Sequence, residues 1–209
     1  VREGKDLFNA AFFLYEKEVK AVVHKTCLPT YDVFDEYRYF EPAYHWQVIP
    51  FKGRKLAVTI CEDIWNLGDN PLYRNCPMDE LMQQGPDLML NISASPFDYT
   101  HVEDRKAIVK LNTMKYQLPM IYCNAVGSQT EIVFDGGSLV FDRAGNLVKQ
   151  LPLFEEAFDV FDLDEEGRFL QEAVILADRL DVSEELTRLN THLARLHDLL
   201  QSGGDAGRR

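Results

Sequence analysis

Short apolar runs separated by polar turns divide most of the chain into strands and helices. Runs of β-branched and aromatic residues indicate strands, whereas apolar positions three and four residues apart indicate helices. Helices are predicted over residues 71–84 and 100–117, the second with Thr100 as its N-cap. Strands are predicted over residues 7–15, 19–24, 46–51, 55–61, 87–93, 120–126, 131–134, 138–141, 147–151 and 157–163.

The buried side of the second helix follows from the same pattern. Its apolar residues lie at spacings that place them along one helix face, which is expected to pack on the sheet. These residues are Val102, Ala107, Ile108, Leu111 and Met114.

The order of the elements predicts an α/β fold. Strands that alternate with helices and then give way to hairpins indicate a mixed sheet covered by helices, and two such sheets can stack face to face. We therefore expect residues 1–164 to form part of an α-β-β-α sandwich. Two helices, 165–180 and 182–201, would follow as a C-terminal arm, and residues 202–209 would form a polar, frayed tail.

Charge and composition exclude several classes of binding partner. The 209 residues are 46% hydrophobic and carry a net charge of -12, which argues against nucleic acids and anionic membranes as partners. Small molecules and proteins are the expected partners. No run of about eighteen apolar residues indicates a membrane span. The four cysteines form no C-x-x-C pair, so no structural metal site is expected and a reducing, cytoplasmic location fits best.

Two strand ends carry reactive side chains. The apolar run over residues 58–60 ends on Cys61, and Lys25 follows the strand 19–24 in the same way. An ammonium near a thiol stabilises the thiolate and can also hold an oxyanion. Each residue alone has a simpler interpretation: Cys61 as a small buried hydrophobe and Lys25 as a solvated charge. Glu36 could likewise be a loop carboxylate paired with an arginine.

Four segments together give a more specific indication. KTCLPTYDVFDEYRYF (25–40), ICEDIW (60–65), NISASPF (91–97) and NAVGSQTEIVFDG (124–136) occur in the order found in the nitrilase superfamily of carbon-nitrogen hydrolases. Within this superfamily the chain most resembles the glutamine amidohydrolase domain of glutamine-dependent NAD synthetases. The resemblance extends from residue 1 to about residue 164 and implies the nitrilase-type sandwich.

The resemblance implies catalytic roles for four residues. Cys61 would attack the side-chain amide of glutamine, form a thioester and release ammonia. Lys25 and the backbone N–H of Glu62 would form the oxyanion hole, and Glu36 would orient the lysine or the attacking water. No metal and no cofactor would take part in this step.

Substrate-binding roles follow from the same resemblance. Tyr31 and Ser95 match positions that hold glutamine. His101 stands where the family usually has a basic residue, so the substrate carboxylate would be held more weakly unless Arg105 compensates. Glutamine remains the expected substrate, and another small amide stays open.

The family's general base is a glutamate several dozen residues before the lysine, but only 24 residues precede Lys25. We therefore expect a chain truncated at its N-terminus and nearly inactive, because such a group contributes about 10²- to 10⁴-fold in rate. ATP and Mg²⁺ would serve only a synthetase domain that the chain lacks. A homo-oligomer and a synthetase domain or subunit are expected partners. The alternatives are a free-standing hydrolase of another amide or nitrile, and a non-catalytic subunit.

Overall fold

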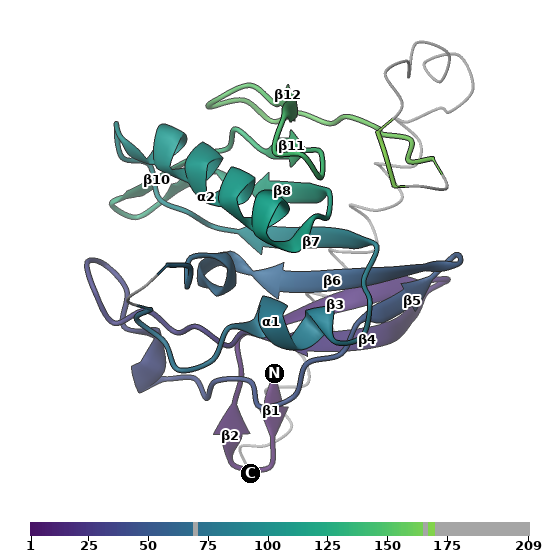
Figure 1. Cartoon of the computed structure of the whole chain (residues 1–209). Helices are drawn as coiled ribbons and strands as arrows, with labels where there is room; N and C mark the ends of the chain where they lie inside the picture. The colour runs from purple at the N-terminus through teal and green to yellow at the C-terminus, as the bar shows by residue number, and fades with distance from the viewer. Residues whose placement is uncertain (69–70, 165–166, 170–209) are drawn as a thin grey trace. The chain divides into compact units, whose positions relative to one another are not determined.

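A six-stranded mixed sheet forms the centre of the unit that comprises Val1–Phe169 (Figure 1). The computed structural model describes residues 1–68, 71–164 and 167–169. The strands lie in the order β12-β11-β8-β7-β6-β5, with β6, β7 and β8 parallel and the outer pairs antiparallel. Their bounds are β5 (Ile49–Phe51), β6 (Arg54–Ile60), β7 (Leu88–Ser93), β8 (Met120–Asn124), β11 (Leu139–Phe141) and β12 (Leu147–Gln150).

The parallel register brings the polar ends of three strands to one edge of the sheet. Ile60 pairs with Ile92, and Ser93 pairs with Asn124. The residues that follow β6 therefore lie beside the last residues of β7 and β8. This edge is where ligands of open α/β sheets usually bind.

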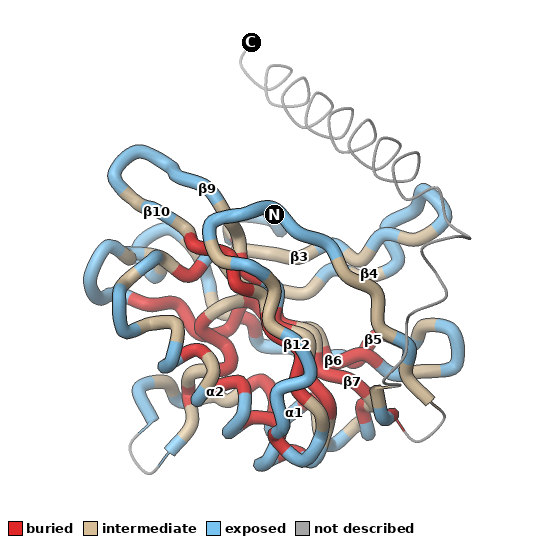
Figure 2. Tube along the Cα trace, turned by 90° about the horizontal axis from the view of Figure 1, so that it is seen from above, coloured by how far each residue is buried: buried red, intermediate tan, exposed pale blue. Residues whose placement is uncertain are grey.

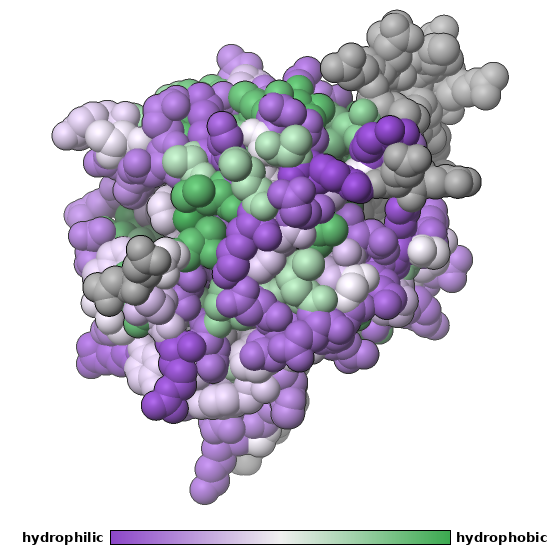
Figure 3. All heavy atoms as spheres, in the orientation of Figure 1, coloured by the Kyte–Doolittle hydropathy of each residue, from purple (hydrophilic) through white to green (hydrophobic). Residues whose placement is uncertain are grey.

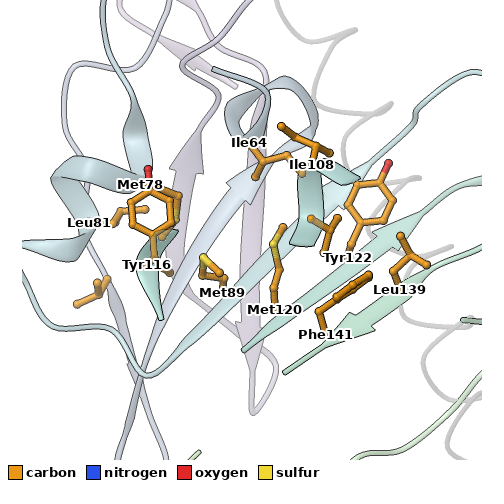
Figure 4. Packing of buried hydrophobic residues seen from close by; sticks show 13 residues of the cluster. Ile64, Met78, Leu81, Met89, Ile108, Tyr116, Met120, Tyr122, Leu139 and Phe141 are labelled. Atoms are coloured by element: carbon orange, nitrogen blue, oxygen red, sulfur yellow. The ribbon is translucent and has the colours of Figure 1, made fainter. Parts of the chain in front are cut away.

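Two helices cover one face of this sheet. α1 (Pro77–Met82) and α2 (His101–Tyr116) pack against it through the larger hydrophobic core (Figure 4). Alternate residues of the strands point to this side, because successive side chains of a strand face opposite ways. The buried members of this core are Val48, Ala57, Ile64, Met78, Leu81, Met89, Ile108, Val109, Tyr116, Met120, Tyr122, Leu139 and Phe141.

A β-hairpin lies against the other face. It consists of β3 (Ala10–Tyr15) and β4 (Glu18–His24), whose two-residue turn has positive φ at Glu16 and Lys17. Phe13 and Tyr15 of the hairpin make edge-to-face contacts with Phe51, at centroid distances of 5.1 and 5.0 Å. A smaller core of Ile49, Leu56 and Leu88 with partly buried neighbours fills this second interface.

Two further ribbons complete the described structure. β1 (Arg2–Glu3) pairs with β2 (Asp6–Leu7), and β9 (Val126–Gln129) pairs with β10 (Ile132–Asp135). Figure 2 shows the second ribbon projecting from the buried centre, with an exposed tip. In the described residues the layers are therefore helices, a six-stranded sheet and a hairpin. The mixed α/β fold is confirmed, whereas the fourth layer of the expected sandwich is not seen in this part of the chain.

Several predicted boundaries are wrong. The first strand breaks at Phe8, because residues 6–7 pair with β1 rather than with β4. The predicted helix 71–84 is helical only from Pro77, where the proline occupies the first turn. Residues 157–163 form no regular strand and make only a single bridge, from Leu163 to Phe169. The predicted C-terminal helices and tail lie outside the described residues, apart from residues 167–169.

The predicted buried face of α2 is only partly correct, because Ile108 is buried in the core as expected but other predicted members are not. Leu111 is 54% exposed and Met114 is 47% exposed. Figure 3, which shows the side that carries α2, has hydrophobic patches among hydrophilic atoms. The buried face instead includes Arg105, whose guanidinium pairs with a carboxylate, and Asn112, whose amide donates to the carbonyls of Ile64 and Ile108. Buried polar side chains with partners thus rotate the helix away from the face that its apolar pattern predicts. Thr100 occupies the N-cap position of α2 as predicted, but its hydroxyl makes no capping hydrogen bond and donates to Asp98 instead.

Candidate active site

A sharp backbone turn presents Cys61 at the end of β6. Its φ is +47°, a left-handed conformation that costs a residue with a side chain about 1–3 kcal/mol and is concentrated at functional sites. The 3₁₀ helix η2 (Cys61–Ile64) begins at this residue. The strand-to-helix turn thus lifts the thiol out of the sheet, as the nucleophile elbow of α/β-hydrolases does for a serine.

Lys25 and Glu36 form a close ion pair beside this turn. Lys25 Nζ donates to Glu36 Oε1 over 2.5 Å, and the lysine is only 1% exposed. Asn9 Nδ2 donates to the second carboxylate oxygen of Glu36 over 3.2 Å. Glu36 begins the short 3₁₀ helix η1 (Glu36–Arg38), which the long loop after β4 carries back toward the sheet edge. The ammonium therefore has a fixed position and keeps donors beyond the one used by Glu36.

Asp63 joins the two segments that carry Cys61 and Lys25. Its Oδ1 accepts the backbone N–H groups of Thr26 and Cys27 over 2.9 and 2.8 Å, and its Oδ2 accepts that of Ile60 over 3.0 Å. Burial raises the pKa of its carboxyl to about 6, and the three N–H donors oppose that rise. The group is therefore ionised at neutral pH and acts as an acceptor only.

Cys61, Lys25 and Glu36 line one cavity of about 370 Å³. The volume suits a small ligand. Most of the lining residues are apolar, and the charge of Lys25 and the side chain of Ser93 act on the thiol. The other lining residues are Asn9, Phe34, Ile60, Ile92, Ser93, Ala94, Pro96, Ile132 and Phe134.

Burial and the neighbouring polar groups act in opposite directions on the pKa of the Cys61 thiol. Burial raises the pKa of Cys61 above its ordinary value. The charge of Lys25, the side chain of Ser93 and the backbone of Ala94 lower it in part, and Glu62 raises it. Lys25 is thus the main group that favours the thiolate, the nucleophilic form of cysteine.

Glu62 and Tyr31 make a second polar cluster next to the thiol. Tyr31 Oη donates to Glu62 Oε1 over 2.6 Å, and Tyr73 Oη donates to the same oxygen over 3.2 Å. Burial raises the pKa of the Glu62 carboxyl, whereas the two tyrosines lower it. Neither Glu62 nor Tyr31 lines the cavity, although Glu62 directly follows Cys61. The predicted oxyanion role of the Glu62 N–H stays a prediction.

The remaining predicted substrate-binding residues lie outside the cavity wall. Ser95 is buried, and its N–H donates to Asn124 Oδ1 over 2.9 Å. His101 begins α2, with Nδ1 3.3 Å from the carbonyl of Pro96. Arg105 is 1% exposed, and both of its terminal nitrogens donate to Asp135. Arg105 therefore has a structural partner that the sequence pattern did not indicate, and its binding role remains a prediction.

Sequence reasoning missed several residues that shape the site. Ser93 donates to Asn91 over 2.7 Å, and Asn91 in turn donates toward the carbonyl of Cys61 over 3.4 Å. Their position at the end of a buried strand was the available signal. Asp63 was equally visible beside Cys61. No group of three or more metal-ligating side chains occurs in the residues that the structure describes. The same part of the chain contains no helix long and apolar enough to cross a membrane.

Comparison with family models places this geometry in context. The model described as "Carbon-nitrogen hydrolase" matches residues 1–169. A second model, described as "Endoribonuclease YicC-like, C-terminal", matches residues 146–209, most of which lie outside the described residues. The first match covers all the site residues named above.

Individual relatives agree with the first match. A glutamine-dependent NAD(+) synthetase from Thermotoga maritima is 40% identical over 164 residues, which are 78% of this chain and 27% of the relative. A solved structure of glutamine-dependent NAD+ synthetase from Acinetobacter baumannii, in complex with ADP, is 30% identical with a TM-score of 0.72, over 80% of this chain and 30% of that one. The chain spans about 30% or less of the length of these curated synthetases.

A smaller hydrolase is also similar. A mutant of the amidase from Nesterenkonia sp. AN1, solved after addition of acrylamide at its active-site cysteine, is 25% identical with a TM-score of 0.53, over 66% of this chain and 49% of that one. The family match over residues 1–169, together with the fold and these relatives, shows that the chain belongs to the carbon-nitrogen hydrolase family.

Proposed function

We propose that this chain carries a cysteine-dependent amidase site that releases ammonia from the side chain of glutamine. The observation that carries the proposal is the presence of Cys61, on its left-handed turn, in one cavity with the Lys25–Glu36 pair. The thiolate would attack the amide carbon, and the C–N bond would then break as the nitrogen takes up a proton and leaves as ammonia. Water would hydrolyse the resulting thioester to glutamate and regenerate the thiol.

Lys25 has the geometry for two tasks in this reaction. One N–H of its ammonium is committed to Glu36, so the others can donate to the oxyanion that forms when the thiolate attacks. Its charge also opposes the effect of burial on the Cys61 thiol. Because Lys25 is nearly fully buried, its charge is screened little by water, and both effects are strengthened.

The proton transfers of this reaction lack a well-placed general base among the described lining residues. In the part of the chain that the structure describes, Glu36 is the carboxylate that lines the cavity, and it accepts hydrogen bonds from Lys25 and Asn9. Because both of its oxygens accept hydrogen bonds, this carboxylate is a poor base for the thiol proton. We therefore expect slow turnover from this chain, lower by about 10² to 10⁴ than with a positioned general base.

The relatives support glutamine as the substrate. The similar synthetases are named as glutamine-dependent, and the similar amidase has an active-site cysteine. The synthetase reaction in the relatives' names belongs to proteins of which this chain matches less than a third. Any use of the ammonia by a synthetase domain or subunit is part of the proposal, and so are the ATP and Mg²⁺ that such a step would need.

One feature favours a second candidate, hydrolysis of a small uncharged amide. The charged residues that line the cavity in the described structure are Lys25 and Glu36, which pair with each other. Arg105 pairs with Asp135, and His101 does not line the cavity. A glutamine carboxylate would therefore find no additional cation among the lining residues, whereas a short aliphatic amide would match the apolar wall.

Covalent labelling tests the site without requiring turnover. The chain is incubated with a chloroketone analogue of glutamine, and the modified cysteines are identified by peptide mass mapping. We expect Cys61 to be modified at least ten times faster than Cys123, although Cys123 is the exposed thiol. Excess glutamine should protect Cys61 if glutamine is the substrate, and excess propionamide should protect it if the second candidate is correct.

Matched variants serve as controls. Cys61→Ala should abolish the fast labelling, whereas Cys123→Ala should leave it unchanged. Modification that follows exposure, or that is spread equally over the four cysteines, would contradict the proposal. Fast labelling of Cys61 with protection by neither amide would contradict both substrates while leaving Cys61 as the reactive thiol.

A further inference from the structure

The Asp63 carboxylate occupies an unusual position between the two reactive segments. It is only 1% exposed, yet it belongs to η2, the turn that carries Cys61. Burying a carboxylate is costly unless it is paired or fully hydrogen-bonded. In the described part of the chain, Asp63 meets this requirement with three backbone N–H donors and no hydrogen bond from a basic side chain, although the charge of Lys25 also acts on it. Its hydrogen bonds therefore fix backbone.

The three donors come from both sides of the site. Ile60 directly precedes Cys61, so the bond to its N–H closes the turn that gives the cysteine its left-handed backbone. Thr26 and Cys27 directly follow Lys25, some 36 residues away in the sequence. One carboxylate thus holds the backbone next to the thiol and the backbone next to the ammonium.

Other hydrogen bonds hold the lysine segment to different parts of the protein. The Lys25 N–H donates to the carbonyl of Asn9 over 2.8 Å, and the Lys25 carbonyl accepts the N–H of Ala43 over 2.9 Å. Trp46 Nε1 donates to Thr26 Oγ1 over 2.9 Å. In the described structure, the Asp63 bonds are those that join residues 25–27 directly to the Cys61 turn. Their loss would leave the segment attached but free to shift relative to the thiol.

We propose that Asp63 is a positioning residue for the reaction, which sets the placement of the Lys25 ammonium relative to the Cys61 thiol. This role rests on the proposed function of that pair. Asp63 does not line the cavity and acts only through the two segments that it joins. The residue type fits the role, because a carboxylate has acceptors on both oxygens, whereas an asparagine would direct N–H donors at one of the backbone N–H groups.

The test measures the reactivity of Cys61 toward iodoacetamide, a small probe that needs no substrate recognition. Alkylation rates of the Cys61 peptide are recorded against pH for the wild type, Asp63→Asn, Lys25→Met and the double variant. Loss of a nearby positive charge raises a thiol pKa by about 1–3 units. Each unit lowers the thiolate fraction about tenfold, and the higher intrinsic nucleophilicity recovers roughly threefold.

We therefore expect Lys25→Met to slow alkylation at neutral pH by about 3- to 40-fold, and Asp63→Asn to slow it at least threefold with a raised kinetic pKa. The double variant should react no more slowly than Lys25→Met alone, because Asp63 acts through the lysine. Effects that multiply in the double variant, or an unchanged rate and pKa in Asp63→Asn, would overturn the proposal. A purely structural role predicts lower stability without the shared pKa shift.

Asp142→Asn is the matched control. Asp142 also accepts backbone N–H groups, from Ala144 and Asn146, but in an exposed turn away from the cavity. Asp142→Asn should leave the pH dependence of Cys61 alkylation unchanged. If Asp63→Asn fails to fold by circular dichroism, Asp63→Ser replaces it, with the same expected and contradicting results. Unselective labelling by the glutamine analogue in the wild type would refute the proposed function, whereas an unaltered iodoacetamide profile in the Asp63 variant would refute only the positioning role.

Discussion

The buried Arg105–Asp135 pair gives a prediction that separates stability from substrate binding. Arg105 is 1% exposed and Asp135 is 0% exposed, and the guanidinium donates to both carboxylate oxygens. Removing one partner leaves a buried, uncompensated charge, which costs about 3–5 kcal/mol. For a domain of this size, each kcal/mol lowers Tm by roughly 2–4 °C, so Arg105→Met or Asp135→Leu should lower Tm by about 6–20 °C.

The double variant Arg105→Met/Asp135→Leu provides the critical comparison. Replacing both charges with apolar side chains of similar volume is often neutral, so the double variant should recover most of the lost stability. The assay is urea unfolding followed by tryptophan fluorescence and circular dichroism, with Tm as a second measure. Single variants that each cost less than about 1 kcal/mol would refute the reasoning, since that is the value of an exposed ion pair.

The same variants test the role of Arg105 in binding. If Arg105 held the substrate carboxylate, Arg105→Met would weaken protection of Cys61 by glutamine but not by propionamide, and the double variant would not restore it. With Arg105 as a structural residue, protection by the two amides should change together or not at all. Loss of glutamine protection alone in a stably folded variant would show that the structural assignment is wrong.

Three further predictions concern single residues. Glu36→Gln removes the carboxylate that pairs with the buried ammonium of Lys25, so it should destabilise the fold by up to about 3–5 kcal/mol in urea unfolding; an unchanged midpoint would contradict the pair. Burial raises the pKa of the Cys27 thiol, so above about pH 8.5 the folded state keeps a proton that the unfolded state loses. The free energy of unfolding should therefore fall as the pH rises beyond that value. Cys27→Ala should make this pH dependence shallower, by up to about 1.4 kcal/mol per pH unit. An identical pH dependence of stability in the wild type and in Cys27→Ala would contradict the burial argument. Gly137→Ala should cost about 1–3 kcal/mol in thermal unfolding, because φ is +65° and the new Cβ would lie 2.5 Å from Leu153 Cδ2; Gly53→Ala, with positive φ and open space, should cost less.

Local sequence was sufficient for much of the fold around the site. The charged turn at residues 16–18 predicted the β3–β4 hairpin, and the apolar run before Cys61 predicted a buried strand that ends at the thiol. These features depend on neighbours a few residues apart, because turns and strand periodicity are set by backbone geometry. The resemblance in four ordered motifs indicated the family and predicted that Lys25, Glu36 and Cys61 belong to one site.

The apolar pattern predicted the buried face of α2 only in part, since Ile108 is buried as expected. The apolar residues Leu111 and Met114 have ordinary helical spacing, yet they are half-exposed. Arg105 and Asn112 occupy the buried side because their polar groups find partners in Asp135 and Ile64. Hydropathy scores a side chain as if it were alone, whereas the cost of burial depends on whether a partner is present.

The sequence by itself determined the chemistry of the site: a thiol at a strand end, a lysine after a second strand, and a loop carboxylate able to pair with it. Only the tertiary structure decided how these groups are held, with Asp63 joining the segments of Cys61 and Lys25 and with Arg105 committed to Asp135. The physical reason is distance along the chain. Side-chain type and local turns are encoded within a few residues, whereas hydrogen bonds between segments some 30 residues apart exist only once the sheet and its helices have packed.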